Sequence, residues 1–229
     1  MNQATMEIFD TPKAEVKPVR LKRNPKRVIT RADNSDIASS VIGPLSQGDE
    51  IFILTAGNFS LIDVLLHALD FTGPADVDCA TWTQGIYDQQ RCAQLVTERR
   101  IRSMRWVVDP SMFARRAELS GRLVERFGVD SFRAVPIHAK YLVVRGEKMS
   151  VAIRSSMNMN ENQKIEQLDI SVCSDMVNFL TDYTDSIFSA VSSSSRSNTR
   201  KVFAKVLAEF QASGNVAEAG SFADRWGIA

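Results

Sequence analysis

The chain has 229 residues, of which 44% are hydrophobic and 24% charged, so it can bury a core and is neither fibrous nor wholly disordered. Its 28 Lys and Arg against 27 Asp and Glu leave a net charge of +1, which excludes a whole-molecule attraction to an acidic partner. Three scattered Cys and only two His argue against a disulfide scaffold and against a Cys- or His-based metal centre. We therefore expect neither a metal nor a cofactor.

Residues 1–35 are predicted to form a basic flexible arm of extended or disordered chain. By position 31 this stretch holds eight basic and three acidic residues, a local charge of +5, and three prolines interrupt it. A basic arm suits contact with a polyphosphate, because each neutralised phosphate releases counterions. A merely solvated tail is the alternative interpretation. The arm residues that we expect to bind nucleic acid are Arg20, Lys22, Arg23, Lys26 and Arg27.

No targeting or membrane segment is expected. The first residues lack the unbroken apolar stretch of a signal peptide, and the longest apolar runs are too short to cross a bilayer. We expect a cytoplasmic protein that does not contact membranes.

Strands and helices alternate over residues 36–127. The pattern predicts a short helix, a strand of apolar residues, and a helix that Ser60 caps and Gly73 ends. Two further strand and helix pairs follow, and this alternation is typical of a sheet covered by helices. The expected ranges are 37–45, 50–55, 77–82, 85–100, 104–109 and 114–127.

The predicted alternation of strands and helices ends after residue 130. Four short strands follow without a helix between them, at 131–135, 139–145, 148–154 and 168–173, and a long helix is predicted at 175–191. The main domain is therefore expected to span residues 36–191. Beyond it, the composition predicts a Ser-rich linker at 192–198 and a helical appendage at 199–229.

The candidate catalytic residues lie around the second and third of these short strands. His138 and Lys140 stand two apart at the mouth of a strand, so their side chains share a face. A turn at Gly146 sends the chain back, and Ser156 and Asn158 then emerge beside them. A nucleophilic imidazole, a fixed cation and an amide donor are suited to attacking a phosphodiester and holding its oxygens.

This pattern resembles the phospholipase D superfamily, whose motif is His-x-Lys, a hairpin, a Ser-x-Asn segment and a downstream Glu, here Glu166. The resemblance covers roughly residues 36–190 and implies an α/β fold with a mixed β-sheet flanked by helices. One position departs from the motif: the family usually has an Asp, chiefly structural, where this chain has Arg145. Members that behave as restriction endonucleases lack that Asp, so the departure favours the nuclease branch.

The resemblance also implies a mechanism. His138 would attack phosphorus to form a phosphohistidine, while a second His138 protonates the leaving oxygen and later activates water. Lys140 and Asn158 would hold the oxygens, and Glu166 would orient an imidazole. The chain has one such motif, and we interpret His67 as a residue on a helix face, so a homodimer with a shared site is expected.

We therefore expect a metal-independent nuclease acting on nucleic acid, most of all on DNA. A catalytically silent nucleic-acid-binding or regulatory protein on the same fold is the alternative, and a lipid phosphodiesterase is disfavoured because no amphipathic membrane-binding helix is evident. Arg154 is a further candidate for contact with nucleic acid, whereas Trp82 and Trp106 are expected in the core rather than as platforms for bases.

Overall fold

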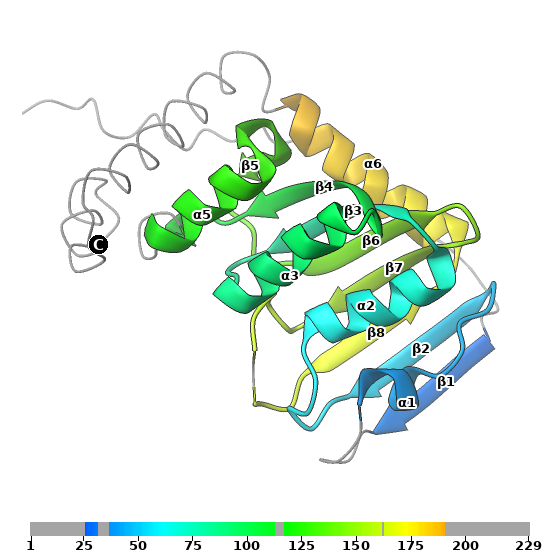
Figure 1. Ribbon diagram of the computed structural model, residues 1–229. Coiled ribbons are helices and arrows are strands. Elements are labelled where there is room, and N and C mark those ends of the chain that lie inside the picture. The colour runs from blue at the N-terminus through cyan, green and yellow to red at the C-terminus, as the bar shows by residue number, and fades with distance from the viewer. Residues whose placement is uncertain (1–25, 32–36, 113–116, 162, 191–229) are drawn as a thin grey trace, which may run out of the picture.

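The computed structural model describes residues 26–31, 37–112, 117–161 and 163–190, which form one eight-stranded mixed sheet with helices on both faces (Figure 1). The strands lie in the order β1-β2-β8-β7-β6-β3-β4-β5. Their bounds are β1 Lys26–Arg31, β2 Asp49–Leu54, β3 Ala75–Thr81, β4 Ile101–Val108, β5 Phe132–Ala134, β6 Lys140–Gly146, β7 Ser150–Ser155 and β8 Gln167–Ser171.

The directions of the strands bring distant parts of the chain to one edge. β1 is parallel to β2, and β3, β4 and β5 are parallel to one another. β8, β7 and β6 lie between these two groups, and each is antiparallel to its neighbours. The carboxyl ends of β2, β3, β4 and β7 therefore meet the amino ends of β6 and β8 along the same edge.

Two apolar cores lie on the two faces of the sheet. Figure 1 shows α1 (Ala38–Ile42), α2 (Leu61–Thr72), α3 (Ile86–Thr97) and α5 (Ala117–Phe127) on one face and α6 (Ser174–Ala190) on the other. The larger core lies under the first group and contains Trp106, which is fully buried and packs against Phe127 and Phe132. The smaller core lies under α6. None of the helices in the described ranges is both long and apolar enough to cross a membrane.

Local sequence explains where α2 begins and why residue 146, at the end of β6, is a glycine. The backbone N–H and the hydroxyl of Ser60 both donate to Asp63 Oδ2, at 2.8 and 2.9 Å, which closes a capping box at the start of α2. At the end of β6, Gly146 lies against the backbone of Thr72, the last residue of α2. A Cβ at position 146 would lie 2.2 Å from the Thr72 carbonyl oxygen, so only glycine fits there.

The sequence predicted the mixed α/β class, and the structure confirms it. Each expected helix and strand between residues 37 and 190 is present, with ends that differ by a few residues. The first helix is shorter than expected, because Gly43 at φ +69° ends it one residue before Pro44. The structure gives no description of residues 1–25 or 191–229, so the expectations for most of the arm, the linker and the appendage lie outside the described residues.

Residues 26–31 of the expected arm are extended, but they belong to the sheet rather than to a flexible segment. Lys26–Arg31 forms strand β1 and pairs in parallel with β2 from Lys26↔Asp49 to Arg31↔Leu54. Lys26 and Val28 in this edge strand are exposed, so the apolar Val28 does not mark a buried face as it would in an inner strand.

Candidate active site

The hairpin of β6 and β7 places His138, Lys140, Ser156 and Asn158 at one edge of the sheet. Lys140, the first residue of β6, pairs with Ser155, the last residue of β7. His138 therefore precedes one strand while Ser156 and Asn158 follow the other. β8 runs antiparallel beside β7, so Glu166, which precedes β8, arrives at the same edge. The structure brings together all five residues that the sequence singled out.

Lys140 and His138 are in direct contact. Nζ of Lys140 lies 3.1 Å from Nδ1 and 3.2 Å from Nε2 of His138, and it donates a hydrogen bond of 2.6 Å to the His138 carbonyl oxygen. Lys140 is only 7% exposed, whereas His138 is exposed at the edge. The arrangement offers an accessible imidazole with a fixed amine behind it.

Ser156 and Glu166 form a second pair at this edge. The hydroxyl of Ser156 donates to Glu166 Oε2 and accepts a hydrogen bond of 2.8 Å from the backbone N–H of Gln167. Thr55, at the end of β2, fixes the backbone of Glu166 through two hydrogen bonds of 2.9 and 3.0 Å. Glu166 is thus fixed twice: Ser156, after β7, binds its carboxylate, and Thr55, after β2, binds its backbone.

Asn158 connects the hairpin to the end of β3. Its Oδ1 accepts hydrogen bonds from the backbone N–H of Trp82 at 3.3 Å and from Oγ1 of Thr81 at 3.4 Å. No described residue accepts a hydrogen bond from its Nδ2, so the donor end of the amide is the end available to an anion. Trp82 in turn lies beside His138, with 6.0 Å between the ring centroids.

Burial lowers the pKa of Lys140 from its ordinary value of 10.5, and the nearby Glu166 carboxylate opposes part of that shift. The opposing effect shows that Glu166 is close enough to act on Lys140. These residues therefore lie at one edge of the sheet and are linked by pairwise contacts: Lys140 to His138, His138 to Trp82, Trp82 to Asn158, and Ser156 to Glu166.

Two buried polar residues that follow β3 have side-chain atoms without a hydrogen-bond partner among the described residues. Gln84 is fully buried and neither atom of its amide is hydrogen-bonded, and Oδ1 of the buried Asp88 is likewise unpaired. Burial, opposed by a backbone hydrogen bond and helped by the carboxylates of Asp63 and Glu161, raises the pKa of Asp88 to about 6. Neither residue was predicted to be functional, because a polar residue just before a helix and an Asp in its first turn are common.

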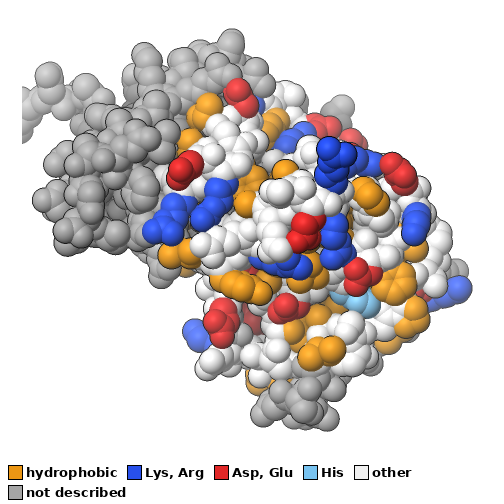
Figure 2. Space-filling model, viewed as in Figure 1, with side chains coloured by type: hydrophobic (Ala, Val, Ile, Leu, Met, Phe, Trp, Pro, Cys, Tyr) orange, Lys and Arg blue, Asp and Glu red, His pale blue; other side chains and the backbone are white. Residues whose placement is uncertain are grey.

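The residues expected to bind nucleic acid are not gathered at this edge. Lys26 and Arg27 begin β1, and the start of β1 lies at the opposite edge of the sheet from His138. Arg20, Lys22 and Arg23 lie outside the described residues. Figure 2 shows Lys and Arg interspersed with Asp and Glu over the face that carries α1, α2 and α3, without a large patch of one sign.

Arg154 is half-buried and its guanidinium is already paired within the sheet, so the expectation that it contacts nucleic acid fits poorly with its position. Its guanidinium donates a hydrogen bond of 2.9 Å to Ser171 and lies 3.5 Å from Glu50 and 4.0 Å from Asp169. These three partners come from β2 and β8, and together they match the charge of Arg154 within the sheet. The arginine therefore ties three strands together.

The other histidine, His67, is buried in the fold and has a structural role. His67 lies in the middle of α2, is 8% exposed, and its Nε2 lies 2.7 Å from the carbonyl oxygen of Gly43. This contact joins α2 to the end of α1. The position agrees with the interpretation of His67 as a residue of a helix face, and it leaves His138 as the one described imidazole at the edge.

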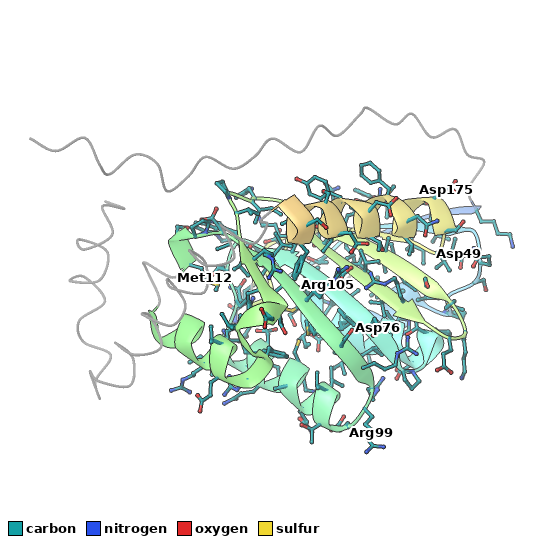
Figure 3. All side chains as sticks on the ribbon, turned by 90° about the horizontal axis from the view of Figure 1, so that it is seen from above. Asp49, Asp76, Arg99, Arg105, Met112 and Asp175 are labelled. Atoms are coloured by element: carbon teal, nitrogen blue, oxygen red, sulfur yellow. The ribbon has the colours of Figure 1, made fainter. Side chains whose placement is uncertain are left out.

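Arg145 lies at the other end of β6 from Lys140. Its guanidinium donates to the fully buried carboxylate of Asp78 on β3 and to Thr181 on α6, at 3.2 Å for the latter. Arg105 on β4 binds the same carboxylate at 2.6 and 2.8 Å, and Figure 3 shows Arg105 beside α6. Arg145, which stands where the resembled family has an Asp, therefore points to the α6 face of the sheet with its charge paired. It lies outside the candidate site.

The part of the chain that the structure describes contains no group of three or more His, Cys, Asp or Glu placed to bind a metal ion.

No family model matches this chain, and no curated protein matches its sequence.

Proposed function

We propose that the protein is a metal-independent phosphodiesterase of the phospholipase D type that cleaves nucleic acid, with DNA as the expected substrate. The observation that carries this proposal is the contact of Lys140 Nζ with both ring nitrogens of the exposed His138. An amine held at that point would lie next to a phosphate whose phosphorus the imidazole attacks. Nδ2 of Asn158 is a second donor for the same oxygens.

The reaction would proceed in two displacements. A nitrogen of His138 attacks phosphorus and forms a P–N bond while the P–O bond to one nucleoside breaks, and the leaving oxygen takes a proton from a second imidazole. That imidazole, now a base, removes a proton from water, and the resulting oxygen attacks phosphorus and breaks the P–N bond. Lys140 and Asn158 stabilise the charge on the non-bridging oxygens in both steps.

The second imidazole is supplied by a second copy of the chain. His138 is exposed at the edge of the sheet, and His67 is engaged with Gly43 inside the fold. A twofold axis at this edge would place two copies of His138 face to face and complete the site. We therefore propose a homodimer as the active form.

The position of Arg145 supports retained catalysis over a silent binding protein. Lys140 and Arg145 occupy opposite ends of β6, and the charge of Arg145 is matched by Asp78. The substitution that separates this chain from most of the family thus leaves the proposed catalytic groups in place.

The test is cleavage of plasmid DNA and of a generic phosphodiester in excess EDTA. We expect wild type to cleave and His138→Ala to lose at least 1,000-fold in rate, about the scale of removing a nucleophile. His67→Ala is the matched control, because it removes the other described imidazole without touching the site. Activity that requires a divalent metal, or that survives His138→Ala, would contradict the proposal, and DNA binding without cleavage would favour the silent protein.

A further inference from the structure

His138 lies on a short connector, residues 135–139, that carries the chain from β5 to β6. Two strands, β4 and β3, separate β5 from β6 in the sheet, so the connector passes the carboxyl ends of both before β6 begins. It has neither helical nor strand structure of its own. The position of the imidazole therefore depends on which groups bind the backbone of the connector.

The end of β4 binds this connector at two points. The backbone N–H of Val135 donates to the carbonyl oxygen of Val108 at 3.0 Å. The backbone N–H of Ile137 donates to Oδ2 of Asp109 at 3.2 Å. The second hydrogen bond is made by a side chain, and it lies one residue before His138.

The carboxylate of Asp109 is itself held in one orientation. Its Oδ1 accepts hydrogen bonds from the backbone N–H of Ser111, at 2.9 Å, and from the Ser111 hydroxyl. Ser111 thus binds one carboxylate oxygen, and the other, Oδ2, faces Ile137. The negative charge of the acceptor strengthens these hydrogen bonds. Asp109 therefore joins the residues that follow β4 to the connector that carries His138.

The peptide that leads to His138 is fixed on both sides. The side chain of Ile137 is 8% exposed and lies in the smaller core under α6, while Asp109 binds its backbone. From this fixed point the imidazole of His138 reaches Lys140, whose Nζ lies 3.1 and 3.2 Å from the two ring nitrogens. A displacement of about 1 Å at a reacting group can cost about 100-fold in rate, so the anchor of this peptide matters to the reaction.

We propose that Asp109 is a positioning residue, whose carboxylate sets the backbone at Ile137 and thereby holds the imidazole of His138 against Lys140. The inference rests on the proposed function and adds to it a residue from the end of β4. The sequence gives no sign of this role, because an Asp followed by a Pro at the end of a strand is typical of an ordinary turn.

Three substitutions separate the position of the carboxylate from its charge. Asp109→Ala removes both, Asp109→Glu keeps the charge but moves it by one methylene, and Asp109→Asn keeps one oxygen in place. We expect kcat for phosphodiester cleavage in excess EDTA to fall about 100-fold in Asp109→Ala and Asp109→Glu and about ten-fold in Asp109→Asn, with KM within about three-fold of wild type. A wild-type kcat in Asp109→Glu would show that the charge acts without the position and would overturn the inference.

NMR measures the position of the imidazole without relying on activity. Because Lys140 Nζ contacts both ring nitrogens, wild type should show nuclear Overhauser cross-peaks between the His138 ring and the Lys140 side chain. We expect Asp109→Ala to lose these cross-peaks and Asp109→Asn to keep them in part.

Asp49→Ala is the matched control for both measurements. Oδ2 of Asp49 accepts a hydrogen bond of 2.8 Å from the backbone N–H of Ser46, and Asp49 begins β2 at the opposite edge of the sheet from His138. Asp49→Ala should therefore change neither the cross-peaks nor kcat. Thermal melting checks that each variant is folded, and if Asp109→Ala does not fold, Asp109→Asn decides by its partial loss of both signals.

The two proposals fail in different ways. If His138→Ala abolishes cleavage while Asp109→Ala keeps the wild-type rate or the cross-peaks, the positioning inference fails alone. If wild type cleaves nothing but Asp109→Ala loses the cross-peaks, the proposed function is wrong while Asp109 still sets the position of His138. If wild type shows neither cleavage nor cross-peaks, both proposals are wrong.

Discussion

Arg145 on β6 and Asp78 on β3 form an ion pair in which the acid is fully buried and the arginine side chain is 26% exposed. The resembled family has an acid where this chain has Arg145. Here the acid stands on the neighbouring strand, and Arg105 on β4 binds it from the other side, so two guanidinium groups enclose one carboxylate. The pairing raises the pKa of Arg105, chiefly through its hydrogen bond to Asp78.

Restoring the family residue should therefore harm this protein. Arg145→Asp would place a second carboxylate next to the buried Asp78, and we expect it to lower the free energy of unfolding by about 3–5 kcal/mol. Arg145→Met removes the charge but keeps the aliphatic packing and leaves Arg105 on Asp78, so about 1–2 kcal/mol is expected. Urea denaturation with a common m-value measures both.

Arg102 provides the control for that comparison. It pairs with two acids, Asp76 and Glu147, but its side chain is 39% exposed, so Arg102→Met should lower the free energy of unfolding less than Arg145→Met does. If Arg145→Asp proves no worse than Arg145→Met, Asp78 does not depend on Arg145. The rate of DNA cleavage per folded molecule should be unchanged in all three variants.

These charge pairs mark the limit of what the sequence could predict. Apolar periodicity and glycine punctuation were enough for the order of elements and for the hairpin that returns Ser156 and Asn158 to His138, because both depend on local pattern and pairing register. Asp78 looked like an ordinary interruption of a strand, and nothing in the sequence shows which arginines lie beside it. Its partners are 27 and 67 positions away in the chain, so only the sheet order reveals them.

Strand β1 and the position of Trp82 beside His138 were not predicted from the sequence, for a different reason. An edge strand needs no alternation of apolar residues, and Lys26 and Arg27 suggested an arm rather than a strand. For Trp82 the sequence gives residue type and neighbourhood, but its exposure depends on which loop covers the end of β3. In the structure the 158–160 segment reaches that end through Asn158 and leaves the indole beside His138.

Asp88 should make stability depend on pH. Its pKa in the folded protein is raised from 3.8 to about 6, so the folded state holds the proton more tightly than the unfolded state does. This contribution is fully present below pH 3.8 and is lost as the pH rises through about 6. Asp88→Asn, which cannot ionise, should therefore be more stable than wild type at pH 8, by at most about 3 kcal/mol, and similar to it at pH 4.

Denaturation of wild type and Asp88→Asn across pH 4–8 measures this difference. Asp70→Asn is a suitable control, since Asp70 is exposed on α2 and pairs with Arg100. A difference between wild type and Asp88→Asn that does not grow with pH would show that Asp88 is solvated rather than buried without a partner.

The basic arm should be visible in the salt dependence of DNA binding. If Arg20, Lys22 and Arg23 each neutralise a phosphate, replacing all three by Ala should reduce the slope of log K against log salt by about 2–3, uniformly across sequences. Arg154→Ala is the contrasting variant: because Arg154 is paired with Glu50 and Ser171, we expect a loss of stability and an unchanged slope. An unchanged slope in the triple variant would mean that the arm is a solvated tail.

Lys140 should set the alkaline limit of cleavage. Because burial lowers its pKa from 10.5, Lys140 loses its charge, and with it the stabilisation of the phosphate oxygens, at a lower pH than an exposed lysine would. Lys140→Met should lose about 100-fold or more in rate at every pH. Lys140→Arg keeps its charge throughout, so it should cleave more slowly than wild type near pH 7 but show no decline up to pH 10. Rates in EDTA from pH 6 to 10 check both variants. The same alkaline decline in wild type and Lys140→Arg would show that another group limits the reaction and that the Lys140 charge is not required.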